Sequence, residues 1–157
     1  PLRRADETAR ALAEATGLPV QHDARLMEIH QGEWQGVLVD DIKRQWPSLF
    51  AHWQASPWEV KLPGGESLLQ LRVRVLSALA DIFRRHPGQR VAVVTHKLPI
   101  AVIKIRLLHL DPGDIWNLIP DNASWEEVKV EIADLAQFDR DAPAEQERRS
   151  DKRDDDL

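Results

Sequence analysis

Apolar residues recur at helical spacing in three stretches of the chain. Over residues 3–16 the apolar side chains share one helical face, and Gly17 follows in a position where helices commonly end. Residues 68–85 repeat leucine, valine and isoleucine at the same spacing, after a Ser-x-x-Gln capping box that begins at Ser67. A third helix is expected at about 99–108, because proline suits the first turn of a helix. The pattern therefore predicts helices at the start, in the middle and in the second half of the chain.

A continuously apolar run at 91–95 follows a Pro-Gly turn and is typical of a strand buried on both faces. His96 comes directly after this run, and the third predicted helix follows it, so the three parts form an α/β unit. Strand-forming residues with mixed periodicity between 125 and 132 predict a last strand. The fold class expected from these elements is α/β.

The remaining stretches are predicted to be loops and short helices. Residues 25–36 have no regular periodicity, and two glycines four positions apart suggest a loop with tight backbone. A short helix is expected to begin at Asp40 and to end before Pro47, and residues 46–58 predict a further helical excursion. Four tryptophans in this part of the chain are interpreted as packing residues rather than as the lining of a substrate entrance: Trp34, Trp46, Trp53 and Trp58.

The composition narrows the class of protein. A chain of 157 residues that is 43% hydrophobic and 30% charged, with a mean hydropathy of −0.42, fits one soluble globular domain. The net charge of −5 disfavours nucleic acid as a partner, since such binders usually carry a basic excess. The absence of cysteine excludes disulfides, a thiolate nucleophile and cysteine-ligated metal sites. There is no long apolar run and no signal-like start, so we expect no membrane partner and a cytoplasmic location.

The two ends of the chain differ from its middle. We expect residues 1–138 to form the folded domain and residues 139–157 to be a charged, disordered tail, because the tail has no aromatic or β-branched residue. The chain opens at Pro1 without an initiator methionine and enters a helical pattern at once. We therefore expect it to be a segment of a longer protein.

Three side chains are candidates for chemistry. His96 stands where the predicted strand ends, and ligands of open α/β sheets bind beyond the carboxyl ends of strands. Arg3 and Arg4 open the first helix, where free N–H groups favour an anion and a guanidinium can hold two phosphate oxygens. Glu28 stands between apolar neighbours and could keep its proton near neutral pH, as a general acid must. The alternative for each is structural: a histidine satisfied by backbone, a solvated arginine and a solvated loop carboxylate.

Other chemistry has less support in the sequence. His30 and Glu33 lie close to Glu28 and compete with it for the acid role, although each is more often structural or exposed. No histidine pair has the spacing of a metal-binding helix, and no glycine-rich nucleotide loop is present. We therefore expect neither a metal nor a cofactor.

Five short motifs occur in order along the chain. They are PLRRADET at 1–8, RLME continuing to GEWQG at 25–36, PGGES at 63–67, VVTH at 93–96 and DNAS at 121–124. Taken together they resemble the motifs of the histidine phosphatase superfamily, the phosphoglycerate-mutase-like group. The resemblance covers about residues 1–138, and five linked motifs are far more specific than any one of them.

The resemblance implies a fold, an activity and three residue roles. The fold would be a three-layer α/β/α sandwich of the phosphoglycerate-mutase type. The activity would be hydrolysis of a small phosphorylated substrate, a phosphomonoester, through a phosphohistidine and without a metal. Arg4 matches the family's phosphate-binding arginine, Glu28 its proton donor, and His96 the second active-site histidine, which stabilises the phosphoryl group.

The chain also departs from the family pattern. The family's nucleophile lies in an Arg-His-Gly motif after a first strand, upstream of the arginine helix, and none of the six histidines maps onto it. The resemblance therefore implies an N-terminally truncated domain, which we expect to be inactive alone. After the second histidine the family usually has glycine and, five positions on, arginine, whereas this chain has Lys97 and Ala101. These departures leave the pocket lining and the substrate open.

Three functional hypotheses remain. The leading one is a histidine-type phosphatase whose nucleophile lies outside this sequence, with a phosphoglycerate-type mutase as a less favoured variant. A second is a non-catalytic descendant that binds a phosphorylated ligand through Arg4 and His96. A third is a structural chain without a ligand. The sequence does not indicate an oligomeric state.

Overall fold

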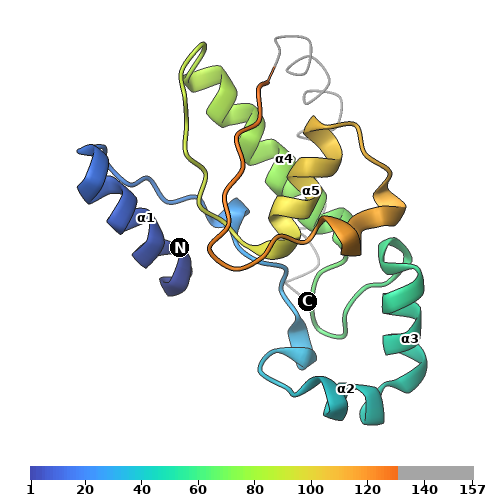
Figure 1. Cartoon of the computed structure of the whole chain (residues 1–157). Helices are drawn as coiled ribbons and strands as arrows, with labels where there is room; N and C mark the ends of the chain where they lie inside the picture. Colours follow the sequence, from blue (N-terminus) through green and yellow to red (C-terminus); the bar gives the residue numbers. More distant parts are fainter. Residues whose placement is uncertain (131–157) are drawn as a thin grey trace, which may run out of the picture.

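The computed structural model describes residues 1–130, which form a group of helices joined by long irregular segments (Figure 1). Five α-helices are found in this part of the chain: α1 (Arg3–Thr16), α2 (Val39–Gln45), α3 (Pro47–Ala55), α4 (Leu68–Arg85) and α5 (Lys97–Leu107). Four short 3-10 turns accompany them: η1 (Ala24–Leu26), η2 (Gly32–Trp34), η3 (Pro57–Glu59) and η4 (Pro112–Leu118). The helices predicted at 3–16 and 68–85 are confirmed with the same bounds, and the helix predicted at about 99–108 begins two residues earlier.

Helix α4 is the central element of the structure, and its sequence explains both its start and its burial. The hydroxyl of Ser67 accepts a hydrogen bond from the backbone N–H of Gln70 at 3.2 Å, and the Gln70 side chain accepts one from the Ser67 N–H at 2.9 Å. This capping box satisfies two donors that would otherwise lack partners. Leu68, Leu71 and Val75, on the apolar face of the helix, are fully buried.

The core extends from α4 to a cluster of aromatic rings. Trp34 and Trp53 are buried, and their ring centroids lie 6.5 Å apart in an edge-on arrangement. Trp46 and Phe50 pack against Trp34 on one side, and Trp116 packs against Trp53 on the other. The prediction that the tryptophans are packing residues is confirmed for Trp34 and Trp53.

The predicted strand at 91–95 is wrong for this structure. The described residues contain no regular strand, and the single bridge between extended segments joins Lys61 and Ser67. Residues 90–95 lie outside any helix or strand and have no backbone–backbone hydrogen bond to any other described residue, and Val91 exposes 43% of its surface. A strand needs backbone hydrogen bonds to a neighbouring strand, and no such bond joins this segment to another described residue.

The predicted three-layer α/β/α sandwich is therefore not formed by residues 1–130, which are mostly helical. The last strand, predicted between 125 and 132, is also absent as far as residue 130, and the rest of it lies outside the described residues. The tail predicted at 139–157 lies outside them entirely. Within the described part of the chain, no helix is long and apolar enough to span a membrane.

Helix α1 is packed much less closely than α4. Figure 1 shows it at one side of the molecule, and Ala5 is its one buried residue. A carboxylate oxygen of Asp6 lies 2.7 Å from Nε2 of His22, which links the helix to the segment that follows it. Leu12 remains exposed although it belongs to the apolar face of the helix. The side of α1 that its sequence predicts to be covered is thus only partly covered by the described residues.

Candidate functional site

The loop that carries Glu28 is held against the PGGES turn by backbone contacts. The Glu33 N–H donates to the Pro63 carbonyl at 2.8 Å, and the Glu66 N–H donates to the His30 carbonyl at 2.8 Å. Gly32 has a positive φ of 56°, and a Cβ there would collide with the backbone of Pro63. The two segments therefore approach so closely that only glycine fits at this position.

This packing predicts that alanine substitutions at two glycines of the same loop lower the free energy of unfolding by very different amounts. Gly32→Ala should lower the free energy of unfolding by more than about 2 kcal/mol, because it adds a backbone collision to an unfavourable φ. Gly36 is the matched control: its φ of 75° is also positive, but a Cβ there would meet no atom within 4 Å. Gly36→Ala should cost about 1 kcal/mol. Urea unfolding measures both, and equal losses would show that the close approach to Pro63 does not exist.

His96 lies immediately before α5 and is 7% exposed. Its backbone is extended, with φ −122° and ψ 174°, so the residue forms the N-cap position of the helix. Burial lowers the pKa of His96 to about 4, and the positive charges of Arg4, the amino terminus and Arg74 act in the same direction. The imidazole is therefore uncharged at neutral pH.

Glu28 reaches the first turn of α5. Burial raises the pKa of the Glu28 carboxyl above its ordinary value, although the backbone N–H groups of Ile29, Leu98 and Lys97 and the charge of Arg4 oppose this shift. The Ile29 N–H donates to Oε1 of Glu28 at 3.0 Å. A carboxyl in this environment retains its proton to a higher pH than an exposed glutamate, which is what a general acid requires.

Arg4 lies in the first turn of α1 and is exposed. Its charge acts to lower the pKa of both Glu28 and His96, so the three residues lie near enough to interact electrostatically although they are widely separated in the sequence. A small cavity of about 40 Å³ reaches His96 and is lined by Ala5, Asp6 and Ala9 of α1 and by Val94, whereas Arg4 and Glu28 do not line it. The segment before His96 is tied to the Glu28 loop, because the Thr95 hydroxyl donates to the Leu26 carbonyl at 2.6 Å.

The two competing candidates lie elsewhere on the loop. His30 is exposed, and its Nδ1 accepts a hydrogen bond from the Gly32 N–H at 3.2 Å. Glu33 is also exposed. Neither side chain has the burial that raises the pKa of Glu28, so the geometry favours Glu28 among the three as a proton donor.

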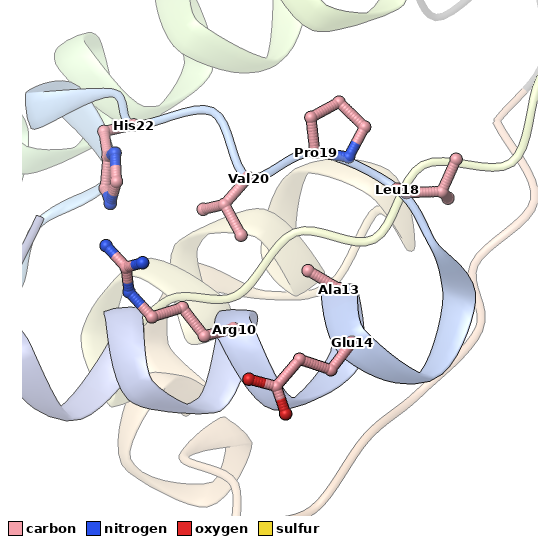
Figure 2. Close-up of a pocket in the computed structure, with 7 residues that line it drawn as sticks. All are labelled: Arg10, Ala13, Glu14, Leu18, Pro19, Val20 and His22. Carbon is pink, nitrogen blue, oxygen red and sulfur yellow. The ribbon is translucent and has the colours of Figure 1, made fainter.

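A larger and more open pocket lies away from these residues, between the second half of α1 and the segment that follows it (Figure 2). It has a volume of about 370 Å³ and is lined by Arg10, Ala13, Glu14, Leu18, Pro19, Val20 and His22. Two of its polar side chains are already engaged, because Arg10 and His22 both pair with the carboxylate of Asp6. We therefore place the candidate site at Arg4, Glu28 and His96 and not in this pocket.

Sequence reasoning missed the side chains that hold the Glu28 loop. Arg74 projects from α4 and donates hydrogen bonds to the carbonyls of Arg25, Met27 and Glu28. It also pairs with the carboxylate of Glu66. One signal was available in the sequence. Arg74 stands next to Val75 on the apolar side of a helix, where a charged residue needs a partner.

Among the described residues, no group of three histidine, cysteine or acidic side chains could hold a metal ion.

Comparison with known proteins decides the family. The sequence matches the histidine phosphatase superfamily (branch 1) over residues 1–135. The chain belongs to this superfamily. Members with similar sequences include phosphoserine phosphatase 1 of Hydrogenobacter thermophilus, which is 37% identical over 131 residues, 83% of this chain and 62% of the relative. Glucosyl-3-phosphoglycerate phosphatase of Mycobacterium tuberculosis is 32% identical over 149 residues, 88% of this chain and 66% of the relative.

Solved structures also resemble this chain. The mycobacterial glucosyl-3-phosphoglycerate phosphatase in complex with inorganic phosphate has 32% identity and a TM-score of 0.63, over 73% of this chain and 58% of that one. Bacillus stearothermophilus YhfR has 26% identity and a TM-score of 0.70, over 85% of this chain and 72% of that one. The chain thus spans somewhat under two thirds of the length of several relatives that it matches.

Proposed function

We propose that this chain is the larger part of a phosphomonoester hydrolase of the histidine type and that Arg4, Glu28 and His96 form its phosphoryl site. The observation that carries the proposal is that the charge of one arginine acts on both a desolvated carboxyl, that of Glu28, and a neutral buried imidazole, that of His96. The names of the relatives support a phosphatase more than a mutase, since phosphoserine phosphatases and glucosyl-3-phosphoglycerate phosphatases are among them. The substrate class is a small phosphate monoester.

The residues divide the work of phosphoryl transfer. Arg4 neutralises the equatorial oxygens of the transferring group, and His96 donates a hydrogen bond to the same group. Glu28 protonates the leaving alkoxide and afterwards takes a proton from the water that hydrolyses the phosphohistidine. A neutral His96 has one ring N–H, which it can donate to a phosphoryl oxygen.

The attacking histidine comes from a segment outside the given sequence in this proposal. Residues 19–22 and 90–95 both lie outside any helix or strand and make no backbone–backbone hydrogen bond with the rest of the described chain. The cavity beside His96 is lined by Val20, Gln21 and His22 from the first segment and by Val94 from the second. A further strand that lay alongside these segments would satisfy their backbone groups. It would end beside His96, where an attacking group is needed.

Adding that segment should restore activity and stability together. A chain extended upstream with the first strand and Arg-His-Gly loop of a related phosphatase should hydrolyse phosphate monoesters, whereas the 157-residue chain should not. It should also unfold at a higher temperature, because the added strand pairs with exposed backbone. Turnover is measured by phosphate release, and acid-labile phosphate should appear on the added histidine. Acid-labile labelling of His96 in the 157-residue chain would contradict the assigned roles.

A non-catalytic phospho-ligand binder is the second candidate, and it is favoured by one observation: none of the six histidines matches the family's nucleophile. It would use Arg4 and His96 to hold the phosphate group without transferring it. An extended chain that binds phosphate but shows neither turnover nor acid-labile labelling would favour this reading over the phosphatase.

A further inference from the structure

Every donor of the Arg74 guanidinium is used inside the molecule. Its Nε and one terminal nitrogen donate to the two carboxylate oxygens of Glu66 at 2.7 and 2.8 Å. The same terminal nitrogen donates to the Glu28 carbonyl at 3.0 Å, and the other donates to the carbonyls of Arg25 and Met27, both at 2.7 Å. An arginine has five N–H donors, so this geometry leaves none of them for solvent or ligand.

Glu66 completes the arrangement from the other side of the loop. One of its carboxylate oxygens accepts a hydrogen bond from the His30 N–H at 2.8 Å, and its own N–H donates to the His30 carbonyl at 2.8 Å. Arg74 therefore holds backbone carbonyls up to and including that of Glu28, and Glu66 holds the backbone two residues later. The backbone is therefore held on both sides of the candidate acid, by Arg74 at the carbonyls of residues up to Glu28 and by Glu66 at His30.

Both members of the pair are charged at neutral pH. Burial acts to raise the pKa of Glu66, but the hydrogen bonds from Arg74 and from the His30 N–H outweigh it and hold this pKa below its ordinary value. The side chains of Arg74 and Glu66 are 20% and 22% exposed, so water screens their interaction less than at an open surface. A bidentate pair between arginine and a carboxylate also fixes the orientation of the guanidinium plane.

We propose that Arg74 and Glu66 are positioning residues that hold the Glu28 carboxyl at the first turn of α5, in reach of the phosphoryl site. This inference rests on the proposed function, since it assigns Glu28 the acid role. It follows from the convergence of three carbonyls on one planar group, which fixes the backbone that leads to the acid. A displacement of about 1 Å in a catalytic group can cost about 100-fold in rate.

Lysine cannot replace Arg74 in this role. An ammonium has three donors on one atom, so it cannot reach a carboxylate with two parallel bonds and three separate carbonyls at once. Arg74→Lys therefore keeps the positive charge but cannot form the full set of hydrogen bonds to Glu66 and to the three carbonyls. Arg44→Lys is a matched control, because Arg44 also pairs with a single carboxylate, that of Asp41, but lies on α2, away from Glu28.

The hydrogen bonds of Arg74 and Glu66 to the Glu28 loop are called the Arg74 clamp below. The first experiment tests this clamp without any need for enzymatic activity. Carboxyl-carbon NMR follows the titration of Glu28 in the 157-residue chain, with the charged neighbours Arg4 and Lys97 left in place. Arg74→Lys should move the pKa of Glu28 down towards its ordinary value, because the loosened loop admits water, and should speed amide exchange at His30. The Arg44→Lys control should change neither. A folded Arg74→Lys chain in which Glu28 and the His30 amide behave as in the parent would overturn the inference.

Glu66→Gln provides a second variant if Arg74→Lys does not fold. Its amide can accept from only one nitrogen of Arg74 and places a donor against the other, so the loop should loosen as in Arg74→Lys. The same downward shift in the pKa of Glu28 is expected. Parent-like titration of Glu28 in this variant would also overturn the inference.

The second experiment measures catalysis in the extended chain. Arg74→Lys should slow hydrolysis of esters with poor leaving groups about 10- to 100-fold, in kcat rather than in KM, and should leave nitrophenyl phosphate nearly unchanged. An equal loss on both esters would reduce Arg74 to a general structural role. If the extended parent shows no turnover, the proposed function fails, and the NMR experiment still decides whether the clamp holds Glu28.

Discussion

In the extended chain, Glu28→Gln should slow hydrolysis of alkyl phosphates about 100- to 10,000-fold, the usual loss when a general acid is removed. Alkoxides are poor leaving groups and need a proton as the bond to phosphorus breaks. Nitrophenolate leaves without one, so nitrophenyl phosphate should be hydrolysed by the variant at close to the parent rate. The burial that raises the pKa of Glu28 is what equips it to carry this proton near neutral pH.

The control for this prediction is the ratio of the two rates. Steady-state kinetics on the two esters gives the ratio directly, and it is insensitive to the amount of folded protein. His30→Gln and Glu33→Gln should leave the ratio unchanged, because both side chains are exposed. An equal effect of Glu28→Gln on the two esters would remove Glu28 from the acid role and direct attention to His30 or Glu33.

Arg4→Ala should slow both esters alike, by about 100- to 1,000-fold, because it acts on the phosphoryl group that they share. The loss should appear in kcat/KM and should not depend on the leaving group. Arg3→Ala is the matched control: Arg3 opens the same helix, but its side chain is 90% exposed and pairs with Glu7 at 2.7 Å. A loss of similar size in Arg3→Ala, or a loss that depends on the leaving group in Arg4→Ala, would contradict the assignment.

The helices could be predicted from the sequence because their signals are local. The periodicity of 68–85 and the capping box at Ser67 lie within a few residues of each other, and the structure has the helix with these bounds. The prediction of a strand at 91–95 was wrong because strand formation depends on contacts that are not local. An apolar run shows that a segment can be a strand, but pairing depends on a second segment, which the described residues do not supply.

The candidate site shows the same contrast between what local sequence signals predict and what depends on distant contacts. The residues alone left Arg4, Glu28 and His96 with structural alternatives, and the resemblance to a family was needed to connect them. The Arg74 clamp was not predicted, because its hydrogen bonds reach backbone 46 to 49 positions away in the sequence. No local pattern encodes such contacts.

Titration of His96 with and without inorganic phosphate tests the shared phosphoryl site most directly. In the free 157-residue chain, proton NMR should give a pKa of about 4, set by burial and by nearby positive charge. A phosphate anion favours the protonated imidazole, so saturating phosphate should raise this pKa. Arg4→Met should abolish the phosphate-dependent rise, while Arg44→Met should leave it intact. A pKa of His96 that does not respond to phosphate, or that responds equally in the Arg4→Met chain, would contradict the account.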